Sequence, residues 1–90
     1  MIKGRVKVIN RLGLHARAAA LVVKKAAEFE SKITLIREEK SIYADAKSIL
    51  SVLTLAAAQG MELMLEVDGS DENAAFEAIS SLFETGFGEV

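Results

Sequence analysis

The chain has 90 residues, of which 51% are hydrophobic and only 6% are aromatic, and its formal net charge is −2. This length predicts one small domain over residues 1–90, and the composition predicts an aliphatic core and argues against disorder. The chain has no cysteine, which excludes disulfides, thiolate nucleophiles and cysteine-based metal sites, and its net charge argues against general nucleic-acid binding.

No segment approaches the roughly 18 consecutive apolar residues of a membrane span, and the first residues lack the apolar stretch of a signal peptide. We therefore expect a soluble, cytoplasmic protein without membrane insertion. Basic residues are concentrated in the first third of the chain, at Lys3, Arg5, Lys7, Arg11, Arg17, Lys24 and Lys25. This bias suits an acidic protein partner or a phosphoryl group.

The first half of the chain predicts three strands and one helix. Residues 2–8 alternate between small or apolar and basic side chains, which is typical of a half-buried strand. Residues 16–29 carry apolar side chains at helical spacing. Residues 33–36 and 42–44 predict two further strands, joined as a hairpin by the charged residues 37–40.

The second half predicts a short apolar helix over about residues 47–54, with Gly60 available to terminate it. A strand over residues 62–67 follows, and Ser70 is a candidate N-cap for a last helix that ends at Gly86. The order is therefore βαββαβα. We predict an α+β two-layer open-faced sandwich, with a four-stranded antiparallel sheet covered on one face by three helices.

His15 is the only histidine, and it lies between the first strand and the first helix. Unpaired backbone N–H groups and the helix dipole favour an anion at a helix N-terminus. The guanidinium of Arg17 adds donors suited to phosphate oxygens. An imidazole of ordinary basicity is also substantially neutral near pH 7 and available as a nucleophile. The local residues alone leave an alternative, in which His15 is an incidental capping or solvent-exposed side chain.

Residues Gly13-Leu14-His15-Ala16-Arg17 resemble the active-site signature of the HPr family, the histidine-phosphorylated carriers of the bacterial phosphotransferase system. Ala46-Lys47-Ser48-Ile49-Leu50 resembles the second signature of that family. Residues 68–72 and the tail Gly86-Phe87-Gly88-Glu89 are similar to its C-terminal third. The likeness spans essentially the whole chain, and three such segments in the right order are much more specific than one.

The resemblance implies that His15 accepts a phosphoryl group from phosphorylated enzyme I and passes it to a IIA-type domain. Arg17 and the backbone N–H groups of Ala16, Arg17 and Ala18 would stabilise the phosphate, with no cofactor and no metal. Such a protein is a phosphoryl carrier rather than a stand-alone enzyme. The resemblance also implies a partner surface, to which we assign Leu14, Ala20, Lys24, Lys47, Ile49, Leu50 and Leu53.

Ser48 corresponds to the regulatory serine of the family, which HPr kinase phosphorylates in some bacteria. Serine before an apolar helix is also a good N-cap, and the two roles are compatible. The chain departs from the family at Ala18, where proline is usual, so the phosphate site either is looser or gains a donor.

The segments 10–13 and 82–87 look more like the nitrogen-related branch of the family than the sugar-transport branch. The alternative function is therefore a regulatory module of that branch, which acts mainly by docking to partner proteins.

Overall fold

The sheet has four antiparallel strands in the spatial order β1-β4-β2-β3. The structure is a computed structural model that describes residues 1–89. Its elements along the chain are β1 (Ile2–Lys7), α1 (Ala16–Ala26), β2 (Lys32–Arg37), the short 3₁₀ helix η1 (Glu38–Lys40), β3 (Ile42–Asp45), α2 (Ile49–Leu53), β4 (Glu62–Asp68), α3 (Glu72–Glu84) and the 3₁₀ turn η2 (Gly86–Gly88). The predicted order and the α+β open-faced sandwich are confirmed.

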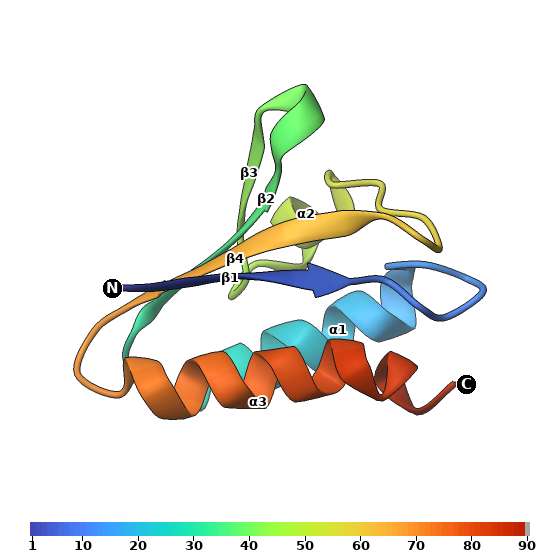
Figure 1. Ribbon diagram of the computed structural model, residues 1–90. Helices are drawn as coiled ribbons and strands as arrows, with labels where there is room; N and C mark the ends of the chain where they lie inside the picture. Colours follow the sequence, from blue (N-terminus) through green and yellow to red (C-terminus); the bar gives the residue numbers. More distant parts are fainter. Residues whose placement is uncertain (90) are drawn as a thin grey trace.

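The long helices α1 and α3 run side by side along one face of the sheet (Figure 1). Apolar side chains of the strands alternate toward that face, because successive side chains of a strand point to opposite sides. One core results, and its largest fully buried side chains include Ile33 and Leu35 of β2, Leu63, Leu65 and Val67 of β4, Val22 of α1, Val52 of α2, and Ile79 and Phe83 of α3. This core fixes α1, and with it the loop that precedes α1.

The loop between β1 and α1 is held against the segment that follows α2. Val8 N donates to Met61 O at 2.9 Å, and Gly60 N donates to Val8 O at 2.7 Å. Leu14 N donates to Ala57 O at 2.9 Å. These backbone bonds fix the position at which the chain enters α1, whose N-cap His15 directly follows Leu14.

The ends of the first two helices differ from the prediction. Helix α1 ends at Ala26 and not at residue 29, because Glu28 N and Phe29 N form tighter bonds to carbonyls three residues earlier. Phe29 still packs against the core, which extends the apolar periodicity beyond the helix. Helix α2 covers only Ile49–Leu53 of the predicted 47–54. Gly60 does not terminate it, since Gly60 lies in the turn before β4.

Ser70 is not the N-cap of α3, which is Asp71. The Asp71 side chain makes no capping hydrogen bond to its own helix. Instead its carboxylate accepts hydrogen bonds from Glu30 N at 2.9 Å and from Ser31 N at 3.0 Å, which ties α3 to the loop before β2. A hydrogen bond from the Ser31 hydroxyl is the largest cause that lowers the pKa of Asp71 below its usual value, and the two backbone bonds act in the same direction. Gly86, with φ 60°, follows the C-cap residue Thr85 of α3, in agreement with the predicted helix end.

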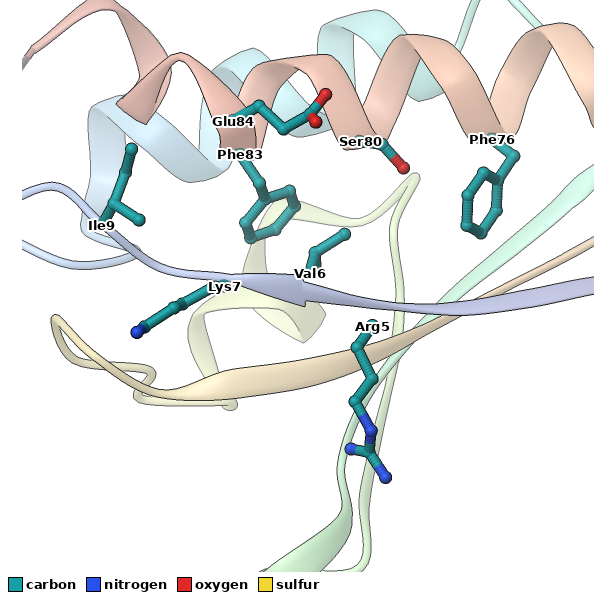
Figure 2. A pocket seen from close by; sticks show the side chains of 8 residues that line it. All are labelled: Arg5, Val6, Lys7, Ile9, Phe76, Ser80, Phe83 and Glu84. Atoms are coloured by element: carbon teal, nitrogen blue, oxygen red, sulfur yellow. The ribbon is translucent and has the colours of Figure 1, made fainter.

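A groove of about 570 Å³ lies between the edge strand β1 and helix α3 (Figure 2). Its lining residues are Arg5, Val6, Lys7, Ile9, Phe76, Ser80, Phe83 and Glu84. Phe83 and Val6 lie between the helix and the strand, whereas Arg5 points away from α3 (Figure 2). No helix among residues 1–89 has the length and apolar character needed to cross a bilayer.

Candidate functional site

His15 is the N-cap residue of α1. Its backbone is extended, with φ −79° and ψ −177°, and the first helical hydrogen bond joins Ala19 N to His15 O at 2.8 Å. Ring atom Nδ1 accepts a hydrogen bond from Arg17 N at 3.3 Å. The side chain is 26% exposed, so solvent and a partner protein can reach the ring.

The first turn of α1 offers donors beside Nδ1. The N–H groups of Ala16 and Ala18 have no hydrogen-bond acceptor among the described residues, and the first turn has no acidic side chain. Ala18 itself is fully buried, whereas the Arg17 side chain is exposed. The helix N-terminus therefore presents free amide donors beside the ring, and the exposed guanidinium of Arg17 lies close enough to Glu89 to affect its charge.

The second ring nitrogen contacts a residue from the other end of the chain. Nε2 lies 2.6 Å from Oε2 of Glu89, whose side chain is only 13% exposed. The other carboxylate oxygen of Glu89 accepts a hydrogen bond from Nδ2 of Asn10 at 2.9 Å. Asn10 is fully buried, and the same Nδ2 donates to Gly13 O at 2.8 Å. His15 is thus linked through Glu89 to the loop that precedes it.

This network lowers the pKa of Glu89 below its usual value. The hydrogen bond from Asn10 is the largest cause, and the contact with His15 and the positive charge of Arg17 act in the same direction, while burial opposes them. Glu89 therefore remains a carboxylate throughout the neutral pH range.

A hollow of about 510 Å³ adjoins this network and is lined by Arg11, Leu12, Arg17 and Glu89. Two guanidinium groups face it, from the loop before α1 and from the first turn of α1. Leu12 is 72% exposed at its edge. An anion bound in this hollow would therefore meet two arginines and the carboxylate of Glu89.

Ser48 is the N-cap of α2, and its Oγ accepts a hydrogen bond from Ser51 N at 3.3 Å. The side chain is half-buried. The capping role predicted for Ser48 is therefore present in the structure.

The residues predicted at the partner surface divide into two groups. Leu14 is only 5% exposed and belongs to the core, so its assignment to that surface is corrected: an apolar side chain directly before α1 packs inward. Ala20, Lys24, Lys47, Ile49 and Leu50 are exposed, and Leu53 is half-buried. Leu50 is 75% exposed, and Lys47 Nζ donates to Phe29 O at 2.7 Å. Helix α2 packs against α1. Lys24 lies in the last turn of α1, and Lys47 contacts Phe29 just beyond that helix, so these two charges lie toward the end of α1 that is opposite to His15.

Sequence reasoning did not assign Asn10, Arg11 or Glu89 to the site. Asn10 and Arg11 belong to the same loop as His15, and a buried asparagine before a glycine turn would have been the only local signal. Glu89 is 74 residues from His15 and reaches it only because the chain turns back after α3. Within residues 1–89, no three His, Asp or Glu side chains are grouped as a metal site.

Comparisons with known proteins identify the family to which the chain is similar. The family model "PTS HPr component phosphorylation site" matches residues 2–85. The phosphocarrier protein HPr of Treponema pallidum is 49% identical over 89 residues, which cover 99% of each chain, and the phosphocarrier protein NPr of Proteus mirabilis is 41% identical over 85 residues, which cover 94% of this chain and 93% of the relative. The crystal structure of an HPr from Thermoanaerobacter tengcongensis superposes with a TM-score of 0.92 at 38% identity, covering 100% of this chain and 99% of the other.

Proposed function

Because the chain belongs to the HPr family of the phosphotransferase system, we propose that it is a phosphocarrier whose His15 ring accepts a phosphoryl group from phosphorylated enzyme I and delivers it to a IIA-type domain. The observation that carries this proposal is the placement of His15. Its ring is partly exposed at the N-cap of α1, with Nδ1 directed at the free amide groups of the first turn.

The chemistry requires a nucleophile and a site that holds an anion without trapping it. A ring nitrogen forms the new bond to phosphorus with its lone pair, while the bond from phosphorus to the donor breaks and its electron pair leaves with the donor. The added negative charge would be held by the N–H groups of Ala16, Arg17 and Ala18 and by the Arg17 guanidinium. Such a site is open to solvent, which suits the return of the phosphoryl group to a second protein.

The exposed residues of α1 and α2 support a transient docking surface around the ring. Ile49 and Leu50 supply apolar area, and Arg17 and Lys24 supply positive charge. A partner with a complementary apolar patch and an acidic rim would fit this surface. Enzyme I and IIA-type domains would then use the same face in turn, as a carrier requires.

We further propose that Ser48 is the acceptor for an HPr kinase. A phosphate at this N-cap is electrostatically compatible with the start of α2, so its effect would fall on docking at Ile49 and Leu50 and not on folding. The same surface is compatible with a second function, regulatory docking to partner proteins in a nitrogen-related system, since one of the relatives is a phosphocarrier protein NPr. Incubation with HPr kinase and ATP tests the first idea, which fails if Ser48→Ala is labelled as well as the wild type.

The proposed carrier function is tested by incubating the protein with enzyme I and phosphoenolpyruvate and measuring its intact mass. The wild type should gain one phosphate that is lost in acid, and His15→Ala should gain none. Arg17→Ala should still be labelled, but more slowly. Failure of the wild type to gain an acid-labile phosphate, or equal labelling of His15→Ala, would overturn the proposal.

A further inference from the structure

We propose that Glu89 is a positioning residue for His15: held by Asn10, its carboxylate binds Nε2, keeps the ring proton on that nitrogen and so directs the lone pair of Nδ1 at the first turn of α1. This inference rests on the proposed carrier function. It concerns how the ring is oriented, and where its proton lies, before the transfer.

The hydrogen-bond partners of the ring define one tautomer. Nδ1 faces the N–H of Arg17 at 3.3 Å, and a backbone N–H can only donate, so Nδ1 is the acceptor. Nε2 faces a carboxylate oxygen at 2.6 Å, and an ionised carboxylate can only accept, so Nε2 carries the proton. The lone pair of the neutral ring is therefore on Nδ1, which is the side of the free helix amides.

Glu89 is the residue type that satisfies both of its neighbours. Asn10 Nδ2 and His15 Nε2 are both donors, and each contacts a different oxygen of the carboxylate. A glutamine of nearly the same shape has only one oxygen, so its NH₂ group would face one of the two donors. The two donors around residue 89 therefore favour a glutamate over a glutamine, independently of side-chain volume.

The chain after α3 is built to bring Glu89 back to the ring. Gly86, Phe87 and Gly88 have φ angles of 60°, 57° and 76°, three consecutive residues in the left-handed region. Phe87 is a bulky residue for this conformation, and such a residue persists only where its surroundings hold it. It is buried, and its ring packs edge to face on Phe83 with centroids 5.0 Å apart. The next residue but one is Glu89.

The carboxylate also affects the transfer itself. When the Nδ1 lone pair bonds to phosphorus and the bond from phosphorus to the donor breaks, the ring keeps its Nε2 proton and gains positive charge. The Glu89 carboxylate at 2.6 Å stabilises that charge and retains the proton. When the phosphoryl group leaves for the acceptor protein, the electron pair of the N–P bond returns to Nδ1 and the same neutral tautomer is restored.

The experiment is nitrogen NMR of the unphosphorylated protein with ¹⁵N-labelled histidine, combined with the rate of phosphorylation by enzyme I. In the wild type at neutral pH, we expect the neutral ring to be protonated at Nε2 alone. In Glu89→Gln, we expect a mixture of tautomers and at least about a tenfold lower rate. Glu89→Asp keeps two oxygens and should restore part of both properties. Glu84→Gln is the matched control, because it removes the same charge from an exposed position on α3 and should behave as the wild type.

Phe87→Ala is a second variant, which keeps the Glu89 side chain but removes the packing of residue 87 on Phe83 that holds the turn before Glu89. It should reproduce the tautomer mixture of Glu89→Gln. A wild-type ring protonated at Nδ1, or a Glu89→Gln protein with the wild-type tautomer and rate, would overturn the inference even though the wild type is phosphorylated. A wild type that shows the Nε2 proton but accepts no phosphate would instead refute the carrier function and leave the positioning role supported.

Discussion

Replacing Gly13 by alanine tests the loop that positions His15. Gly13 has φ +70°, and a Cβ built there would lie 2.5 Å from Ala57 O, which is a backbone atom that cannot swing away. The left-handed backbone costs alanine about 1–2 kcal/mol. Moving Ala57 O also weakens its hydrogen bond from Leu14 N, worth roughly 0.5–1.5 kcal/mol, so the expected total destabilisation is about 1.5–3.5 kcal/mol.

Gly60→Ala is the matched control. Gly60 has φ +92°, but a Cβ there meets nothing within 4 Å, so only the backbone cost of about 1–2 kcal/mol applies. Urea unfolding of both variants measures the difference in their free energies of unfolding, and thermal unfolding gives an independent check. In a domain of this size, each further kcal/mol lowers Tm by roughly 4–8 °C. If Gly13→Ala were no less stable than Gly60→Ala, the close approach of Gly13 to Ala57 would be refuted, and with it the account of how the loop is held.

Three further changes test separate parts of the structure. Ala18→Pro removes one free amide donor but no helical hydrogen bond, so the unfolding free energy should change by less than about 1 kcal/mol. The phosphorylated form should hydrolyse faster, and an unchanged half-life would show that this N–H does not bind the phosphate. Ser48→Ala should cost about 1 kcal/mol in thermal unfolding because it removes the cap of α2, and Ser48→Asp should recover most of that loss; equal losses in both variants would argue against the cap. Asp71→Asn should destabilise the protein at pH 7 but much less in strong acid, because the folded-state pKa of Asp71 lies below its usual value of 3.8. The stabilisation by the carboxylate is present above pH 3.8 and is lost as the pH falls through the folded-state pKa, so a stability difference that did not shrink in acid would contradict this reasoning.

The order of elements could be predicted from the sequence because each element has a regular pattern that the fold preserves. The alternation over residues 2–8 corresponds to β1 at Ile2–Lys7, and the pattern over residues 62–67 corresponds to β4 at Glu62–Asp68. In both strands the alternate apolar side chains face the helices, so burial and periodicity carry the same information.

The helix boundaries were less predictable, because local hydrogen bonds decide them. Phe29 continues the apolar spacing of α1 although the chain has already left the helix, since its side chain still reaches the core. Ser70 has the residue type of an N-cap, but the helix begins one residue later. Asp71 then uses its carboxylate on the backbone of residues 30 and 31, a long-range contact that no local pattern records.

Half of the candidate site could be read from the sequence and half could not. His15 and Arg17 lie in one short motif at a strand-to-helix junction, where local chemistry already indicates an anion site. Glu89 is separated from Asn10 by 79 residues, and the two meet only through the turn at Phe87, whose left-handed backbone is not what its residue type predicts. Tertiary packing therefore places Glu89 at Nε2, while the short sequence motif places the backbone donors of α1 at Nδ1.

The covalent attachment point of the phosphoryl group tests the proposed role of His15 and the orientation of its ring most directly. The protein with ¹⁵N-labelled histidine should be phosphorylated by enzyme I and phosphoenolpyruvate, and the coupling of phosphorus to nitrogen measured by NMR. We expect one phosphorus atom coupled to Nδ1 of His15, with the proton still on Nε2 beside Glu89. Coupling to Nε2, or a phosphate with no coupling to either ring nitrogen, would contradict it.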